Sequence, residues 1–190
     1  MRVAGVVLAA GGSSRLGRPK QLLVHEGRTL VRRVAEAAVA AGLSPVVVVL
    51  GARAEEVASE LAGLPVRTVH NPAWEAGMGS SLHVGVRALG EPVDAALVML
   101  CDQLRVDAAH LQALAETFAR TGAPIVASGY GDTRGVPALF ARSVFPELEA
   151  LGADQGARGV IAHEPSRVVE VALPGGVEDI DTASDLSRLR

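Results

Sequence analysis

Apolar residues follow two different spacings along this chain. Short runs dominated by valine, leucine and alanine are typical of buried strands, and they occur at Val3–Ala9, Pro45–Leu50, Val66–His70, Ala95–Leu100, Ile125–Ser128, Val136–Phe140 and Val168–Val171. Apolar residues at helical spacing predict helices at Thr29–Ala41, Glu55–Leu61, Ser80–Leu89, Asp107–Arg120, Arg142–Leu148, Ala157–Ala162 and Ala183–Leu189. Strands that alternate with helices predict an α/β fold, a three-layer arrangement in which a mostly parallel sheet carries helices on both faces.

The same pattern predicts how the chain is divided. Its 190 residues are enough for one packed core, and no linker rich in serine or proline, internal repeat or low-complexity segment interrupts them. We therefore expect one domain over residues 1–190. In open sheets of this class, ligands bind beyond the C-terminal ends of the strands, so the residues that follow each strand are the first candidates for chemistry.

Composition and charge exclude several classes of function. Aromatic residues make up only 3% of the chain and the net charge is −3, which argues against a stacking platform or a basic surface for nucleic acid. The single cysteine, Cys101, allows no intramolecular disulfide and fits a reducing compartment, so we expect a cytoplasmic protein. The first apolar run is too short to cross a membrane and polar residues follow it from Ser13 to Lys20, so we expect neither a signal peptide nor a membrane contact.

A glycine-rich loop follows the first predicted strand and reads LAAGGSSRLGRPK from Leu8 to Lys20. Its glycines let backbone N–H groups face a bound anion, and Arg15, Arg18 and Lys20 add positive charge. Donors together with cations suit a triphosphate, although a tight strand-to-helix turn with solvated basic residues is an alternative for the same pattern. The spacing matches neither the P-loop pattern GxxxxGKS/T nor the dinucleotide fingerprint GxGxxG.

This loop resembles the signature LAAGxSxRMGxxK of the nucleotidyltransferases with a Rossmann-like fold, which include the MobA-like NTP transferases, and Leu16 replaces the usual methionine. The resemblance implies a loop that wraps the base and triphosphate of a nucleotide, with Arg15 and Lys20 as catalytic residues. These roles agree with the chemistry, because negative charge grows on the α-phosphate and the leaving pyrophosphate, and a cation placed beforehand offsets it. The residues expected to bind the nucleotide are Leu8, Ala9, Ala10, Gly11, Gly12, Ser13, Ser14, Arg15 and Lys20.

Two carboxylates are candidate magnesium ligands. Asp102 follows an apolar run, where a hard oxygen beside a phosphate loop suits Mg²⁺, although an isolated aspartate there also suits a turn or a helix cap. Asp181 lies before the last predicted helix, where it or Thr182 is alternatively a helix cap. The same family carries Asp-Gln-Pro after the strand and ends on Asp-Ile-Asp-Thr, so the resemblance implies that Asp102 and Asp181 hold Mg²⁺. Asp179 is a weaker candidate, and Leu104 stands where proline is usual.

Three further segments indicate the acceptor side. Asn71–Leu82 resembles the N-x-x-W/Y-x-x-G-M-x-x-S segment of the molybdenum cofactor cytidylyltransferase branch, and its serines begin a predicted helix whose free N–H groups suit an anion or a plain N-cap. Gly131–Phe140 and Asp154–Arg158 resemble two more segments of that branch, with Val136 where histidine is common. As a lone arginine, Arg158 is more often a solvated surface residue. The residues that the resemblance implies for acceptor binding are Gly79, Ser80, Ser81 and Arg158.

The residues and the resemblance together predict an enzyme, a Mg²⁺-dependent nucleotidyltransferase. Its expected substrates are a nucleoside triphosphate, CTP by resemblance, and a molybdopterin-type acceptor, with pyrophosphate released. A transient contact with the molybdoenzyme that receives the product is a further expectation. Two alternatives stay open: a guanylyl- or sugar-phosphate nucleotidyltransferase with the same chemistry, and a non-catalytic cofactor-binding protein. The five histidines show no zinc spacing, and no GxSxG nucleophile elbow is present.

Overall fold

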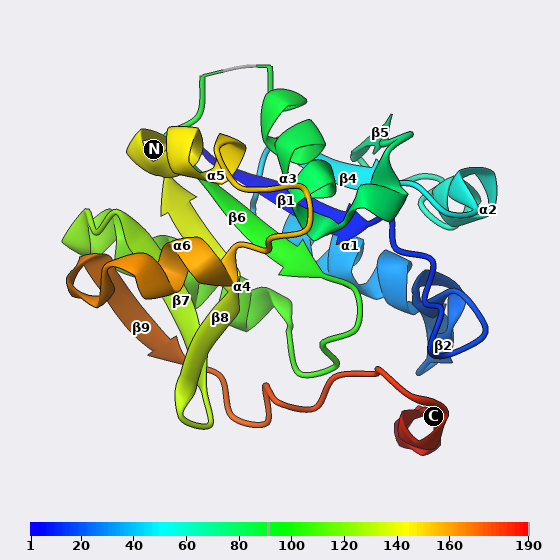
Figure 1. Ribbon diagram of the computed structural model, residues 1–190. Coiled ribbons are helices and arrows are strands. Elements are labelled where there is room, and N and C mark those ends of the chain that lie inside the picture. Colours follow the sequence, from blue (N-terminus) through cyan, green and yellow to red (C-terminus); the bar gives the residue numbers. More distant parts are fainter. Residues whose placement is uncertain (91, 190) are drawn as a thin grey trace.

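The computed structural model describes residues 1–90 and 92–189 and shows a twisted sheet between two layers of helices (Figure 1). Within these residues the main sheet has seven strands in the order β5-β4-β1-β6-β8-β7-β9. Its strands are β1 (Val3–Ala9), β4 (Val46–Leu50), β5 (Arg67–His70), β6 (Ala95–Leu100), β7 (Ile125–Tyr130), β8 (Thr133–Ala141) and β9 (Val168–Ala172). Strand β8 runs antiparallel to β6 and β7, whereas the other neighbouring pairs are parallel. The predicted mostly parallel α/β sheet is confirmed.

Helices and short connections make up most of the rest of the described chain. The α-helices are α1 (Leu30–Ala40), α2 (Ala54–Ser59), α3 (Met78–Arg87), α4 (Ala108–Thr121), α5 (Phe145–Glu149) and α6 (Arg158–His163). The 3₁₀-helices are η1 (Lys20–Leu22), η2 (Trp74–Ala76), η3 (Arg142–Val144), η4 (Pro165–Arg167) and η5 (Ala183–Arg188). A small hairpin of β2 (Val24–His25) and β3 (Arg28–Thr29) follows η1. Among the described residues, no helix has the length and apolar character needed to cross a bilayer.

The valine-rich strands supply both layers of the core, because successive side chains of a strand point to opposite faces of a sheet. On β4, Val46 and Val48 pack in the layer that contains residues of α1, α2 and α4. Val47 and Val49 pack in the layer that contains residues of α3, α5 and α6. Burial on both faces explains why this strand is a continuous apolar run rather than an alternating one.

Strands β1 and β6 lie side by side near the middle of the sheet and position the site. They are parallel with Leu8 opposite Leu100, so the residues that follow them leave the sheet at the same edge. From β1 the chain continues to β4 on one side, whereas β7 and β8, which follow β6, lie on the other side. A crevice opens where two adjacent parallel strands send the chain in opposite directions, and ligands of open α/β sheets bind there. The glycine-rich loop and Asp102 both follow strands at this point.

Some short segments differ from the predicted elements. The hairpin β2–β3 falls where the apolar pattern predicts no element, except at Thr29, which ends β3 rather than beginning the predicted helix. Strand β8 begins at Thr133 rather than Val136, because its pairing with β7 continues to the tight turn between them. The predicted last helix is the 3₁₀-helix η5, whose start is held by a capping box of Thr182 and Asp185.

A buried histidine makes the stability of the fold depend on pH. His110 on α4 is 9% exposed, and its Nε2 lies 2.7 Å from Ser128 Oγ. The Ser128 hydroxyl donates to the carbonyl of Pro137 at 2.6 Å, so it accepts its other hydrogen bond from His110 Nε2. Burial lowers the pKa of His110 below its ordinary value of 6.5, although the charge of Asp107 opposes this.

The folded protein therefore binds this proton less readily than the unfolded chain, so the contribution to stability is full above about pH 6.5 and is lost as the pH falls. We expect the free energy of unfolding to decrease by up to about 1.4 kcal/mol per pH unit from this residue alone. Chemical denaturation at a series of pH values measures the slope, and His110→Gln should flatten it between about pH 6.5 and 5. An unchanged slope in the variant would show that other groups set the pH dependence.

Candidate active site

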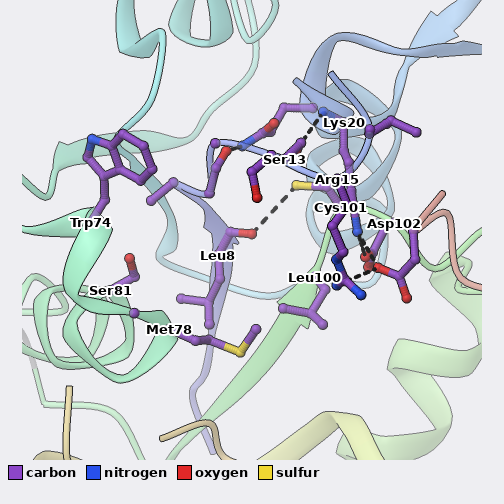
Figure 2. Close-up of a pocket in the computed structure, with 18 of the residues that line it drawn as sticks. Leu8, Ser13, Arg15, Lys20, Trp74, Met78, Ser81, Leu100, Cys101 and Asp102 are labelled. Atoms are coloured by element: carbon purple, nitrogen blue, oxygen red, sulfur yellow. Dashed lines mark hydrogen bonds and ion pairs between the residues drawn. The ribbon is translucent and has the colours of Figure 1, made fainter. Parts of the chain in front are cut away.

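A pocket of about 360 Å³ opens at the C-terminal edge of β1 and β6 (Figure 2). Every residue predicted to bind the nucleotide lines it except Ala9, which is buried in the sheet. Figure 2 shows Lys20 and Asp102 on one side of the pocket and Trp74 and Ser81 on the other. The glycine-rich loop, the start of α3, the end of β6 and the C-terminal segment therefore share one cavity.

Two side chains fix the shape of the glycine-rich loop. Ser13 has a positive φ of 53°, and its Oγ accepts a hydrogen bond from the N–H of Lys20 at 3.0 Å. Gln21 is only 3% exposed and donates through Nε2 to the carbonyls of Ala9 and Gly11, at 2.8 Å each. These bonds tie the loop to η1, which carries Lys20, so the backbone donors and the cation keep a fixed separation.

The ring of Trp74 packs against two glycines. A Cβ added at Gly12 would lie 2.9 Å from the ring. A Cβ added at Gly51 would lie 2.7 Å from Trp74 and 2.6 Å from the carbonyl oxygen of Ala10. Gly51 therefore requires glycine, because a Cβ there would collide with the backbone, whereas a Cβ at Gly12 would require the Trp74 ring to shift. Trp74 thereby forms an aromatic wall of the pocket next to the loop.

Lys20 joins the two predicted metal ligands. Its Nζ lies 2.6 Å from Asp181 Oδ1 and 2.9 Å from Asp102 Oδ2, and Arg15 Nη2 lies 3.7 Å from Asp181 Oδ1. Burial by itself lowers the pKa of Lys20, but the charge of Asp102 and the hydrogen bonds to both carboxylates outweigh burial and raise the pKa above 10.5. The ammonium therefore stays charged at neutral pH. The predicted catalytic cations and the predicted metal ligands form one charged cluster beside the pocket.

The C-terminal strap, residues 177–189, brings Asp181 to this cluster. The N–H of Ile180 donates to the carbonyl of Asp102 at 3.2 Å, which ties the strap to the end of β6. Thr182 forms the capping box at the start of η5. Of the two candidate helix caps, Asp181 and Thr182, the cap is therefore Thr182. The Asp181 carboxylate faces Lys20 instead.

The oxygen atoms in this region suit a divalent cation. Asp102 Oδ1 and Asp179 Oδ1 are buried and accept no hydrogen bond from the described residues. Burial, together with the charges of Asp102 and Asp181, raises the pKa of Asp179 to about 6. Crowded carboxylate oxygens that lack a donor are stabilised by a hard cation such as Mg²⁺. No group of three or more His, Cys, Asp or Glu in the described part of the chain is arranged to hold an ion alone, so further ligands from phosphates and water are needed.

The serines predicted on the acceptor side have different surroundings. Ser81 lines the pocket, and its Oγ accepts from Asn71 Nδ2 at 3.0 Å. Ser80 does not line the pocket. Its hydroxyl donates to the carbonyl of Gly77 at 2.7 Å, and its N–H donates to the carbonyl of Ala153 at 3.1 Å. The donors of Ser80 are therefore used within the protein.

Gly79 and Arg158 also lie outside the pocket lining. Gly79 is buried where residues 152–155 cross the start of α3. Arg158 begins α6 and lies near Tyr130, whose pKa is raised by burial and held back by the charge of Arg158. The structure thus brings the predicted nucleotide and metal residues together with Ser81, and it places Gly79, Ser80 and Arg158 apart from them.

Gln21 and Trp74 shape the pocket but are not among the residues that the sequence predicts for the site. Trp74 has a signal, because it is the single tryptophan of the chain and lies in a segment that resembles the cytidylyltransferase branch. Gln21 has none, because its two carbonyl partners come together only in the folded loop.

Comparisons with known proteins give the family. The model of the MobA-like NTP transferase domain matches residues 5–168. Nicotine blue oxidoreductase from Paenarthrobacter nicotinovorans is 35% identical over 198 residues, which cover 98% of this chain and 96% of that protein. The crystal structure of Rv0371c from Mycobacterium tuberculosis H37Rv has a TM-score of 0.83 and 32% identity, and the match covers 99% of this chain and 97% of that one.

A second structure of Rv0371c is a complex with manganese, and it matches with a TM-score of 0.78 and 31% identity over 100% of this chain and 98% of that one. The family and the fold therefore agree. The chain belongs to the MobA-like NTP transferase family and is a nucleotidyltransferase of that family.

Proposed function

We propose that this nucleotidyltransferase moves CMP from CTP to the terminal phosphate of a molybdenum-bound pterin cofactor and releases pyrophosphate. The observation that carries the nucleotidyl transfer is the cluster of Lys20, Asp102 and Asp181 at the edge of a pocket lined by the glycine-rich loop. An oxygen of the acceptor phosphate forms a bond to the α-phosphorus of the nucleotide while the bond to the leaving pyrophosphate breaks in line.

Positive charge lies where this reaction develops negative charge. Lys20 and Arg15 flank the loop whose backbone donors suit the phosphates, and Lys20 is held by two carboxylates before any substrate binds. A cation that is already oriented loses little energy to reorganisation as the transition state forms. The acceptor is itself an anionic phosphate, so the reaction needs no covalent enzyme intermediate.

Asp102 and Asp181 are the residues that we expect to hold Mg²⁺. Both carboxylates form an ion pair with Lys20 Nζ. The second oxygen of Asp102, Oδ1, is buried and accepts no hydrogen bond from the described residues. Bound there, the ion neutralises phosphate charge. The manganese complex of a related structure supports a divalent cation in this family.

The choice of CTP and of a pterin acceptor rests on the resemblance of three segments to the cytidylyltransferase branch. Two of these segments meet in the fold. A Cβ at Gly77 would lie 2.7 Å from the carbonyl oxygen of Ala153, and a Cβ at Gly79 would lie 2.1 Å from that of Gly152. The segment 71–82 therefore lines the pocket through residues such as Gly77 and Ser81, and the chain just before Arg158 packs against that segment, which supports a shared role in substrate binding.

The test is pyrophosphate release with Mg²⁺, molybdenum cofactor and each of CTP, GTP, ATP and UTP. We expect CTP to be preferred and the rate to fall at least about 10²-fold in Asp102→Asn, because several kcal/mol of charge stabilisation are lost. Glu116→Gln changes an exposed carboxylate on α4, outside every segment assigned to the site, and is the matched control, which should keep the wild-type rate.

The other outcomes separate the alternatives. Turnover with GTP, or with a sugar 1-phosphate as acceptor, would change the substrates and keep the nucleotidyl transfer. Binding that survives Asp102→Asn without pyrophosphate from any triphosphate would indicate a cofactor-binding protein. The name of the Paenarthrobacter relative describes an oxidoreductase, so a redox reaction without pyrophosphate release would also contradict the proposal.

A further inference from the structure

A small apolar cluster lies apart from the two main layers of the core. Its buried members in the described part of the chain are Leu16, Leu23, Leu30 and Ile180, called the loop cluster below. They come from the glycine-rich loop, the residue after η1, the start of α1 and the C-terminal strap. The loop cluster shares no buried member with either main layer, and Cys101 packs against both it and the layer that contains α1, α2 and α4.

The loop cluster supports the groups that form the charged site. Leu23 closes η1, and its N–H donates at 3.1 Å to the carbonyl of Lys20, the first residue of that helix. Ile180 directly precedes Asp181. Lys20 and Asp181, which form the 2.6 Å ion pair, are therefore both connected to the loop cluster, Lys20 through Leu23 and Asp181 through Ile180.

Asp102 is connected to the loop cluster as well. Cys101 and Leu104, on either side of it in the sequence, pack against the loop cluster. The carbonyl of Asp102 accepts the N–H of Ile180 at 3.2 Å. The packing of Leu104 also gives a structural reason for leucine where the family usually has proline.

Ile180 anchors the C-terminal strap. Within the described residues of the strap, Ile180 is the one buried side chain, and Leu186 and Leu189 pack against the loop cluster while remaining partly exposed. Side chains two apart in an extended segment face the same side, so Asp179 and Asp181 face one way and Ile180 the other. Ile180 is fully buried, whereas the side chain of Asp181 is 43% exposed. The position of the Asp181 carboxylate therefore depends on the packing of Ile180.

We propose that Ile180 is a positioning residue: by anchoring the strap in the loop cluster, it sets the distances among Asp181, Lys20 and Asp102 and thereby the affinity of the site for a divalent cation. The expected effect of Ile180 on turnover rests on the proposed function, whereas its expected effect on cation binding does not. A cavity at Ile180 lets the strap move, and a displacement of about 1 Å is enough to slow a reaction about 10²-fold. A cation that takes oxygen ligands at fixed distances is equally sensitive to their separation.

The experiment compares Ile180→Ala with Ile125→Ala. Ile125 on β7 is equally buried but belongs to a main layer of the core. Mn²⁺ binding is measured by electron paramagnetic resonance, and kcat and KM for CTP are measured by pyrophosphate release, all at a temperature where circular dichroism shows folded protein. We expect Ile180→Ala to weaken Mn²⁺ binding and lower kcat about tenfold each, with KM for CTP within about threefold. Ile125→Ala should lower the Tm at least as much and leave all three values within about twofold.

Equal effects of the two variants on Mn²⁺ binding, or no effect of either, would overturn the proposal. If Ile180→Ala does not fold, Ile180→Val against Ile125→Val makes the same comparison with a smaller cavity. If the wild-type protein releases no pyrophosphate from any triphosphate, the proposed function fails, and the Mn²⁺ comparison still decides whether Ile180 positions the carboxylates.

Discussion

Lys20→Met is expected to lower kcat about 10²- to 10³-fold, the effect of removing one preplaced charge from a transition state. Lys20 Nζ lies 2.6 Å from Asp181 and 2.9 Å from Asp102, so the ammonium is oriented before the nucleotide binds. Methionine keeps an unbranched apolar side chain and removes the charge. Steady-state pyrophosphate release with CTP measures the effect, and KM should change much less than kcat because the lost interaction grows in the transition state.

Lys20→Arg is the matched variant. It keeps the charge but spreads it over a planar group of different shape, so it should recover only part of the rate. Lys20→Met also leaves two carboxylates without their cation, so Mg²⁺ should raise the Tm of this variant more than that of the wild-type protein. A wild-type kcat in Lys20→Met, or an equal Mg²⁺ effect on the two Tm values, would contradict this role.

Gly79→Ala is expected to produce the largest loss of stability from a single added methyl group. An ideal Cβ there lies 2.1 Å from the carbonyl oxygen of Gly152 and 2.6 Å from that of Gln155. Both neighbours are backbone atoms, so neither is able to rotate away. We expect the free energy of unfolding to fall by about 3 kcal/mol, at the upper end of the effect of overpacking, as measured by chemical denaturation.

Gly159→Ala supplies the control for this substitution. Gly159 lies in α6, and no heavy atom is within 4 Å of a Cβ built on it. Alanine there should raise the free energy of unfolding by about 0.5–1 kcal/mol, because glycine is the poorer helix residue. Equal stabilities of the two variants would show that residues 152–155 do not press on the start of α3.

The strands that the sequence predicts most accurately are those packed on both faces. Val3–Ala9 and Ala95–Leu100 are predicted with the boundaries that the structure has, because nearly every position in them is apolar and buried. The hairpin β2–β3 has two residues in each strand, too few for a period to be visible. The position of β8 between β6 and β7 is not predictable, because an apolar pattern does not record which strands become neighbours.

The candidate site also contains residues whose positions the sequence predicts and residues whose positions it does not. Lys20 and Asp102 follow strands that meet at one edge of the sheet, so their closeness follows from the strand-end argument. Asp181 does not directly follow a predicted strand, so the residues alone make it a candidate carboxylate and the resemblance implies its place beside Asp102. The contacts of Gln21, Gly79 and Ser80 depend on chain segments that pack against them only in the fold, so no local pattern indicates them.

The most direct test is mass spectrometry of the acceptor after reaction with CTP and Mg²⁺. We expect the wild-type protein to add one CMP to the acceptor phosphate for each pyrophosphate released, and Lys20→Met and Asp102→Asn to form the same product at rates lower by at least about 10²-fold. An acceptor of unchanged mass with every triphosphate, or a product that both variants form at the wild-type rate, would contradict nucleotidyl transfer by the Lys20, Asp102 and Asp181 cluster.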